Sequence, residues 1–392
     1  MIPLMKHAFI NEYETKKALS EFIIKTPKLS MDIECSKFEN KFSKFQKRTE
    51  SILFNSGGSA NLALLQSLKN LGKLKEGDRI GFSALTWSTN VMPILQMGFI
   101  PIPVDCEVDT LNIMSKNLLD RLDDTSLDAL FITNVLGFTG DLDVIKEICD
   151  LKKIILLEDN CESLGTELSS RKAGNFGIAS TFSFFVAHHM STIEGGMVCT
   201  DDTGLAEMLR IVRANGWDRN LSSKQQFVWR QKYNITSEFE AKYTFYDLGF
   251  NMRPTEITGF LGQFQMKFLE ENISRRESNF FTLEEVVNNN PELILLNHSH
   301  LKRLSSFAFP IIVRKGELKQ KYFNQFSGAG VEIRPMIAGN MQRQPFYKKY
   351  VEKVYNLPNT DFIHDNGFYC GNYPELSSVD LETLINCLKN YK

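Results

Sequence analysis

The sequence lacks the features that would place it in a membrane, secreted or nucleic-acid-binding class. No stretch is apolar for long enough to span a bilayer, and residues 1–17 contain no apolar core of signal-peptide length. The formal net charge of -2 provides neither a basic field for nucleic acid nor a basic footprint for a membrane surface. We therefore expect a cytoplasmic protein with no nucleic-acid or membrane partner.

Cysteine pairs are also absent. The seven cysteines occur singly, with no C-x-C or C-x-x-C spacing, so the usual signatures of zinc and iron–sulfur sites are missing. An odd number in a cytosolic chain of this size is typical of reduced, buried thiols. His298 and His300 alternate as neighbours on a strand do, but no cysteine or acidic residue adjoins them in sequence. We expect no metal site.

The 392 residues do contain a regular alternation of short apolar runs and helical patterns, and this length allows a large core. The alternation predicts an α/β fold with a largely parallel sheet covered by helices on both faces. The runs span 79–82, 100–104, 129–133, 154–157, 181–185 and 197–200, with helical candidates near 88–98, 115–122, 142–150 and 204–215.

The pattern changes after about residue 216. The polar and aromatic stretch 217–247 is interpreted as a surface excursion or dimer contact, with direct substrate contact as the alternative. From Asn251 a helix is predicted to run through Thr255 to Leu269, followed by a smaller mixed α/β region. We therefore divide the chain into a large domain over 1–250, which includes an N-terminal helical segment, and a smaller domain over 251–392.

Three segments carry residues suited to binding a phosphorylated ligand. In residues 55–61 (NSGGSAN), Gly58 and Ser59 lie where a helix is predicted to begin, and free N–H groups there suit a phosphate. Asp159 and Glu162 follow an apolar strand, at the edge where open α/β sheets bind ligands. Trp87, in residues 85–90 (LTWSTN), could stack on a ring. Each has a simpler interpretation: a structural turn, solvated acids and a core tryptophan.

These segments resemble, in order and spacing, those of the sugar aminotransferases, a pyridoxal-phosphate family that acts on nucleotide-linked keto-sugars. Residues 181–200, which include Ser183, and residues 248–256 (LGFNMRPTE) extend the resemblance over roughly 28–270. It implies an aspartate-aminotransferase-like architecture (fold type I), with a large cofactor domain holding a mostly parallel mixed sheet and a small C-terminal α/β domain. It also implies a homodimer with shared active sites.

The resemblance implies a set of cofactor-binding residues, namely Gly58, Ser59, Trp87, Asp159, Glu162, Ser183 and Asn251. Trp87 would stack on the pyridine ring, and Asp159 would keep the ring nitrogen protonated so that the ring accepts electrons. Glu162 replaces the family's usual glutamine beside the ring hydroxyl. Asn251 would reach the phosphate of the partner subunit's cofactor.

One position departs from the family in a way that changes the predicted chemistry. The family has a lysine five positions after the serine that corresponds to Ser183, and here that position is His188. Histidine cannot form the Schiff base that the lysine forms, but it can act as a base near neutral pH. A subfamily, the deoxysugar 3-dehydratases, shares this exchange and resembles residues 332–345. His188 is therefore the catalytic candidate, and its neighbour His189 is expected to take no part in catalysis.

The subfamily has two kinds of member, which differ in nucleotide and redox partner. One acts on a CDP-linked sugar and carries an iron–sulfur cluster on closely spaced cysteines. The other, in the colitose pathway, acts on GDP-4-keto-6-deoxy-mannose with pyridoxamine phosphate and glutamate alone. Without a C-x-C pair, this sequence resembles the second kind. A CDP-4-keto-6-deoxy-glucose dehydrase, an ordinary nucleotide-sugar 4-aminotransferase and an inactive cofactor-binding homologue remain the alternatives.

Four residues are candidates for substrate binding: Arg253, Glu332, Arg219 and Arg343. The arginines are proposed because a guanidinium group pairs well with a diphosphate.

Overall fold

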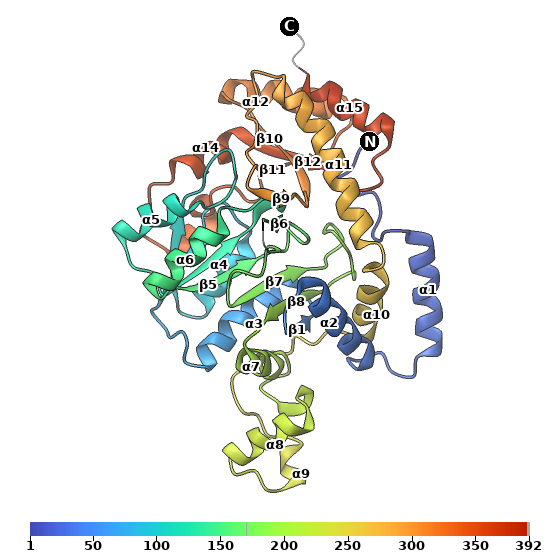
Figure 1. The fold of residues 1–392 in the computed structure, drawn as a ribbon, viewed down its shortest axis with the longest axis vertical. Helices are drawn as coiled ribbons and strands as arrows, with labels where there is room; N and C mark the ends of the chain where they lie inside the picture. The colour runs from blue at the N-terminus through green and yellow to red at the C-terminus, as the bar shows by residue number, and fades with distance from the viewer. Residues whose placement is uncertain (170, 390–392) are drawn as a thin grey trace.

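A seven-stranded sheet forms the centre of the computed structural model, which describes residues 1–169 and 171–389 (Figure 1). The strand order is β1 (Glu50–Phe54), β8 (Gly196–Thr200), β7 (Ala179–Ser183), β5 (Ile155–Asp159), β4 (Ala129–Thr133), β2 (Arg79–Ser83) and β3 (Ile100–Val104). Strand β8 runs antiparallel to both of its neighbours, and the remaining pairs are parallel. The mostly parallel mixed sheet predicted from the alternating pattern is confirmed.

Helices cover both faces of this sheet because its strands are apolar on both sides. On β2, Ile80 and Phe82 pack with one face, against α3 (Gly57–Asn70), α4 (Ser88–Gln96) and α7 (Thr203–Arg213). On β4, Leu130 and Ile132 pack with the other, against α5 (Ser115–Asp124) and α6 (Leu142–Lys152). Side chains that alternate along a strand point to opposite faces, so each strand contributes to two separate cores.

The N-terminal segment is helical, as expected, and forms α1 (Glu12–Lys25) and α2 (Ile33–Gln46). The start of α2 is capped from another part of the chain, because the Glu256 carboxylate accepts hydrogen bonds from the backbone N–H groups of Asp32 (2.7 Å) and Glu34 (2.8 Å). These N–H groups have no partner within a helix, and a carboxylate at a helix N-terminus is favourable. Helix α2 is thereby fixed to the segment that follows residue 250.

The helix predicted from Asn251 to Leu269 is wrong at both ends. Helix α10 spans Glu256–Gln265, and Thr255 caps it by accepting a hydrogen bond from the N–H of Thr258. The chain before it is not helical because Pro254 disfavours the helical conformation of the preceding residue. Residues 266–268 close with tighter turns, such as Phe268 N–H to Gln265 O at 3.0 Å, and a 20-residue helix, α11 (Leu269–Asn288), follows.

Residues 217–247 project from the body at the end of α7, as expected for a surface excursion (Figure 1). They contain η2 (Asp218–Asn220), α8 (Ser223–Lys232) and α9 (Glu238–Ala241), none of which was predicted. Trp229 and Tyr246 hold the excursion together edge to face, with ring centroids 5.8 Å apart. The Trp229 indole N–H also donates to Glu207 on α7 at 3.0 Å.

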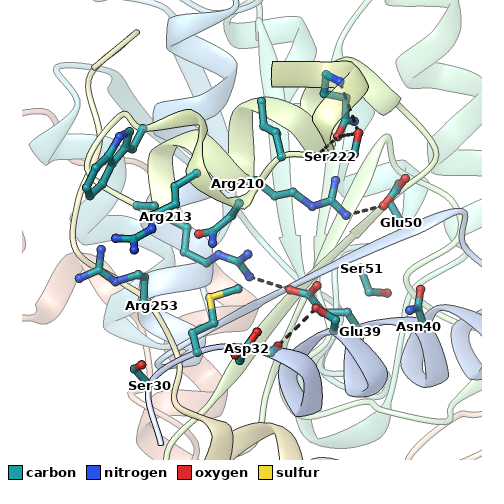
Figure 2. A pocket seen from close by; sticks show the side chains of 18 of the residues that line it. Ser30, Asp32, Glu39, Asn40, Glu50, Ser51, Arg210, Arg213, Ser222 and Arg253 are labelled. Atoms are coloured by element: carbon teal, nitrogen blue, oxygen red, sulfur yellow. Dashed lines mark hydrogen bonds and ion pairs between the residues drawn. The ribbon is translucent and has the colours of Figure 1, made fainter. Parts of the chain in front are cut away.

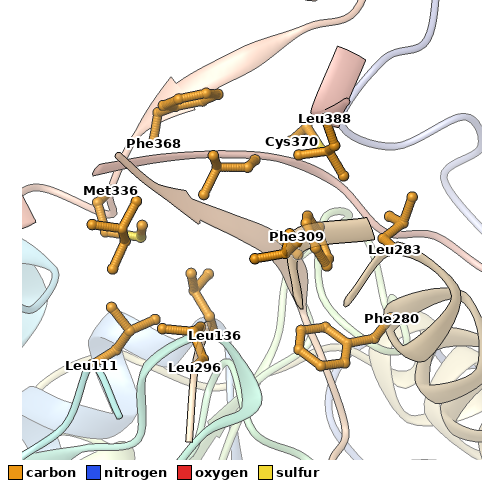
Figure 3. Packing of buried hydrophobic residues seen from close by; sticks show 14 of the residues in the cluster. Leu111, Leu136, Phe280, Leu283, Leu296, Phe309, Met336, Phe368, Cys370 and Leu388 are labelled. Atoms are coloured by element: carbon orange, nitrogen blue, oxygen red, sulfur yellow. The ribbon is translucent and has the colours of Figure 1, made fainter. Parts of the chain in front are cut away.

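The C-terminal region is built on a three-stranded antiparallel sheet, in the order β10 (Ala308–Ile312), β12 (Gly367–Gly371), β11 (Ile333–Pro335). Its other elements are β9 (Leu301–Arg303), η3 (Gly316–Leu318), α12 (Lys319–Gly328), η4 (Met341–Arg343), α13 (Pro345–Tyr350), α14 (Pro358–Asn366) and α15 (Ser378–Leu388). Two short elements of the large-sheet region, η1 (Val135–Gly137) and β6 (Glu167–Leu168), complete the chain. In Figure 3, Leu111 and Leu136 from the large-sheet region join Phe309 and Phe368 in one buried cluster. A division after residue 250 stays a prediction.

None of the helices within 1–169 and 171–389 combines the length and apolar character needed to cross a bilayer. Six of the seven cysteines are buried, Cys161 is half-buried, and all are free thiols.

Candidate active site

Most of the predicted site residues gather at the carboxyl-terminal edge of the large sheet. Asp159 is the last residue of β5 and Ser183 the last of β7, and these strands are parallel neighbours with Asp159 opposite Thr181. The first turn of α3 comes so close that a Cβ atom added to Gly57 would lie 2.7 Å from Ser183 Cβ. The parallel arrangement thus brings together residues far apart in sequence.

The first turn of α3 forms a polar cradle next to Ser183. Ser56 caps the helix by accepting a hydrogen bond from the Ser59 N–H at 3.1 Å, and the Ser56 hydroxyl donates to that of Ser59 at 3.0 Å. Gly58 sits against Thr89 of α4, where a Cβ would approach the threonine methyl to 3.1 Å. The first N–H groups of a helix have no partner within it, and together with the hydroxyls of Ser56 and Ser59 they suit an anion.

Asp159 is buried and held by three N–H donors. Its Oδ2 atom accepts from the side-chain amides of Asn61 (2.8 Å) and Asn90 (2.7 Å), and its Oδ1 atom accepts from the Cys161 backbone (2.9 Å). The carboxylate is therefore fixed at the strand end, as a charged partner for a ring nitrogen must be.

Glu162 lies in the loop after β5 and has a single described hydrogen-bond donor. The backbone N–H of Leu136 donates to its Oε2 atom at 2.9 Å. Burial, and to a smaller extent the charge of Asp159, raise the pKa of Glu162 to about 8, against the opposing effect of the Leu136 N–H. At neutral pH Glu162 therefore carries a proton, which makes it a hydrogen-bond donor as well as an acceptor.

His188 follows β7 and turns its ring toward the same loop. Burial lowers the pKa of His188 to about 4, and the hydrogen bond to the Cys161 backbone only partly offsets this. Its ring packs at a tilt on Phe307, with centroids 5.2 Å apart, and its Nδ1 atom is buried with no described partner. A neutral imidazole with an unused nitrogen can accept a proton.

The other candidate histidines have structural partners. His189 is fully buried, and its Nε2 atom lies 3.1 Å from the carbonyl oxygen of Ser305. His298 does have an acidic neighbour in the fold, since its Nε2 atom lies 2.7 Å from Glu284. That pairing joins α11 to the segment before β9, and the sequence neighbourhood of His298 gave no sign of it.

Trp87 precedes α4 at the same edge and is 55% exposed. An indole this open to solvent is not the core residue of the simpler interpretation, and its face is available for stacking. Its loop is tied to the C-terminal region, because Leu85 pairs with Asn340 in a β-bridge and the Met341 N–H donates to Ala84 at 3.0 Å.

Two of the substrate candidates face a cavity that has a volume of about 840 Å³ and runs between α2 and α7 (Figure 2). Arg219 and Arg253 line it, and within residues 1–169 and 171–389 neither guanidinium group has an ion pair or hydrogen bond. Asn251 is exposed on the strand-like segment leading to Arg253. His188 and Asp159 do not line this cavity.

The remaining two substrate candidates already have partners in the chain. Arg343 pairs with Asp365 through two parallel contacts, of 2.5 and 3.0 Å, and with Asp361 at 2.8 Å. Glu332 forms an ion pair with Arg334 and accepts the Leu4 N–H at 3.0 Å. The guanidinium group of Arg343 is thus already paired with two aspartates, which would compete with a diphosphate for it.

Three residues near the predicted set were not singled out from the sequence: Asn61, Asn90 and Tyr369. The two asparagines stand inside the glycine-rich and tryptophan segments, which is the only signal that could have drawn attention to them. Burial, and next the Glu162 carboxyl, raise the pKa of Tyr369 to about 12. Tyr369 therefore lies near Glu162, with its hydroxyl protonated.

The fold and this arrangement define a class of enzyme. The model of the DegT/DnrJ/EryC1/StrS aminotransferase family matches residues 11–389, so the chain belongs to that family. The resemblance noted from the sequence motifs is confirmed.

Several of the similar proteins within this class are 3-dehydratases. The chain is 33% identical to GDP-4-keto-6-deoxy-D-mannose 3-dehydratase of Escherichia coli O55:H7, over 86% of this chain and 87% of the relative. It is 31% identical to the enzyme of that name from Yersinia pseudotuberculosis, over 94% and 93%. The crystal structure of a GDP-4-keto-6-deoxymannose 3-dehydratase with a trapped PLP–glutamate geminal diamine superposes with a TM-score of 0.91 at 30% identity, covering 99% of this chain and all of that one. The predicted fold is confirmed.

Proposed function

We propose that this protein is a pyridoxamine-phosphate-dependent dehydratase that removes the C3 hydroxyl of GDP-4-keto-6-deoxy-D-mannose, with L-glutamate regenerating the cofactor amine. The observation that carries the proposal is His188, a neutral histidine beside the Asp159–Glu162 loop, at the position where the family has its lysine. The names of the similar dehydratases and the PLP–glutamate adduct in one of them support it. The product would be GDP-4-keto-3,6-dideoxy-D-mannose, a deoxysugar unit for a polysaccharide such as lipopolysaccharide O-antigen.

The residues present fit the cofactor. The start of α3, with Ser59 and Ser183, would hold the phosphate, because Gly57 leaves room for backbone N–H groups to approach it. Trp87 would stack on the ring, and Asp159 would face the ring nitrogen. When bound, the cofactor supplies an amine for the sugar ketone and a ring that accepts electrons.

The chain's own residues then move and hold protons. His188 is neutral at physiological pH because its pKa lies near 4, so it can take a proton at the reacting carbon and return one to the departing hydroxyl. Glu162 is protonated and can donate a hydrogen bond beside the ring. Histidine in place of lysine also leaves the cofactor without a covalent link to this position, so pyridoxamine phosphate is held by these contacts alone.

The test is conversion of the GDP-linked sugar by the purified protein with pyridoxamine phosphate and glutamate. We expect His188→Asn to bind the cofactor but to lose roughly 10²–10⁴-fold in turnover, the usual contribution of general acid–base catalysis. His300→Asn is the matched control, because the one hydrogen bond of the His300 ring within the described residues is to the Thr139 carbonyl, at 2.9 Å. Equal turnover by His188→Asn and wild type would refute the assignment.

We further propose that the enzyme is a homodimer in which Asn251, Arg253 and Arg219 of one protomer complete the partner's site. Two observations support this. His188 does not line the cavity that Arg219 and Arg253 line, and neither guanidinium group has an ion pair or hydrogen bond within the described residues, Arg219 lying only over the Trp217 ring. Arg253 and Arg219 would bind the diphosphate of the substrate, with Glu332 as a further polar contact. A cytoplasmic location belongs to the same proposal, and cell fractionation would test it.

Mixing two inactive variants tests the shared site. His188→Asn and Arg253→Ala should each be inactive, but mixed dimers would contain one site with both defects and one intact site. Random mixing therefore restores about a quarter of wild-type activity. Absence of any recovery, with mixed dimers shown to form, would place His188 and Arg253 in the site of the same protomer.

A further inference from the structure

Two asparagines from different helices meet on one oxygen of Asp159. Asn61, in the second turn of α3, donates its amide to Oδ2 at 2.8 Å, and Asn90, in the first turn of α4, donates to the same atom at 2.7 Å. Both amides are inaccessible to solvent, at 0% and 1% exposed. Burying an amide NH₂ group is costly unless it is hydrogen-bonded, and both NH₂ groups are bonded to Asp159, whereas the Asn61 Oδ1 atom is buried with no described partner.

Each asparagine is also oriented by its surroundings. The Thr86 hydroxyl donates to the Asn90 side-chain oxygen at 3.1 Å, which turns the NH₂ group of Asn90 toward Asp159. The Thr86 hydroxyl also forms a hydrogen bond of 2.7 Å with the hydroxyl of Thr133, at the end of β4. The Asn61 NH₂ group also contacts the Thr89 carbonyl, at 3.3 Å. A chain of buried side chains that begins at the end of β4 therefore directs the Asn90 donor, and the Thr89 backbone carbonyl holds the Asn61 donor.

The donors determine which part of the carboxylate remains available. An ionised carboxylate has about four acceptor positions. The two asparagines occupy those on Oδ2, and the Cys161 backbone occupies one on Oδ1. The fourth position, on Oδ1, is left for the weakly donating thiol of Cys161 or for a stronger donor. Burial, and next the Asp159 carboxylate, raise the pKa of that thiol well above its usual range, so it remains protonated.

We propose that Asn61 and Asn90 are positioning residues that fix Asp159 through Oδ2, so that Oδ1 meets the cofactor's ring nitrogen and keeps that nitrogen protonated. The inference rests on the proposed function for the identity of the ring. Because the two amide donors occupy the acceptor positions of Oδ2, Oδ1 is the oxygen that can accept a hydrogen bond from the ring N–H. A role limited to tying α3 and α4 to β5 is the alternative.

The readout is the ¹⁵N NMR signal of ring-labelled pyridoxamine phosphate bound to each protein, which reports protonation of the ring nitrogen directly. We expect a protonated ring in wild type, a shift toward the unprotonated signal in Asn61→Ala and in Asn90→Ala, and a larger shift in the double variant. Each single variant should lower kcat for the sugar roughly tenfold, as expected for losing a hydrogen bond to a charged group, with KM changed less than about twofold.

Two further variants separate positioning from packing. Asn134→Ala removes another fully buried amide, whose NH₂ group donates to Asn160 at 2.7 Å. Its backbone N–H donates to the Asp159 carbonyl oxygen at 2.9 Å, and alanine keeps that bond, so the ring signal of this variant should match wild type. Asn90→Asp keeps the shape of the side chain but replaces the donor by a second carboxyl, and should shift the signal at least as far as Asn90→Ala. Thermal unfolding of each variant monitors folding.

An unchanged ring signal in Asn61→Ala, Asn90→Ala and the double variant would overturn the inference, as would loss of cofactor binding in all of them, which indicates a packing role. A wild-type ring that is unprotonated would overturn it as well. The proposed function fails separately: wild type that binds pyridoxamine phosphate with a protonated ring but leaves the GDP-linked sugar unchanged refutes the reaction and retains the positioning role.

Discussion

Replacing Glu162 by glutamine tests the charge state of the site, because the two side chains have the same shape and both can accept the Leu136 N–H. The pKa of Glu162 is raised from 4.5 to about 8 in the folded protein. Between these values the unfolded chain has lost the proton and the folded protein has kept it, so a rising pH favours unfolding. Stability from this group is thus fully present below about pH 4.5 and lost as the pH rises through about pH 8.

The size of this pH effect on stability follows from the difference between the unfolded and folded pKa values of Glu162. A difference of 3.5 pK units at about 1.4 kcal/mol each gives an upper limit of about 5 kcal/mol. Because Glu162 keeps some contact with solvent, we expect roughly 2–4 kcal/mol between pH 5 and pH 8. His188 acts in the opposite direction, since its lowered pKa makes stability rise from about pH 4 to 6.5. That contribution is common to both proteins and cancels when they are compared.

The assay is urea unfolding of cofactor-free wild type and Glu162→Gln at four pH values between about 5 and 8. We expect the variant to gain stability relative to wild type as the pH rises, with the difference largest near pH 8. Glu194→Gln, an exposed acid on the loop after His188, is the control and should follow wild type. Parallel curves for wild type and Glu162→Gln would show that Glu162 is ionised at neutral pH, which would refute the reasoning.

Two other substitutions test how the site is built. Gly57→Ala should weaken pyridoxamine phosphate binding at least about tenfold by fluorescence titration, because its Cβ would lie 2.7 Å from Ser183 Cβ; unchanged affinity would contradict the cradle geometry. Arg213→Met should cost about 3–5 kcal/mol in urea unfolding, because it leaves the buried Glu39 carboxylate without the guanidinium 2.6 Å away. Arg210→Met, which removes a more exposed pair with Glu50, should cost about 1 kcal/mol or less, and equal losses in the two variants would contradict this distinction.

The large sheet was predictable because its strands are short, apolar and separated by helices of regular period. Helices α8 and α9 were not predicted, since their side chains show little apolar periodicity. They are held by specific contacts instead, such as the 2.9 Å pair between Arg230 and Asp218 and the packing of Trp229 on Tyr246. Contacts of this kind depend on the fold and leave no local pattern in the sequence.

The positions of candidate site residues were predictable where the residues end strands or begin helices, as Asp159, Ser183 and Ser59 do. Asn61 and Asn90 were missed because they are 98 and 69 positions from Asp159, and only the packing of α3 and α4 at the end of β5 brings them to it. The pairing of Arg343 with Asp361 and Asp365 was hidden in the same way. Which charged groups pair with a side chain is decided by the fold and cannot be deduced from its neighbours in sequence.

The most direct test of the central claim is the mass of the sugar nucleotide recovered after incubating the protein with pyridoxamine phosphate, glutamate and GDP-4-keto-6-deoxy-D-mannose. A dehydratase with His188 as its base predicts a product lighter by one oxygen atom, with no nitrogen retained and ammonia released. A sugar that carries an amino group at C4 would instead identify an aminotransferase, and an unchanged sugar in the presence of bound cofactor would contradict the proposed reaction.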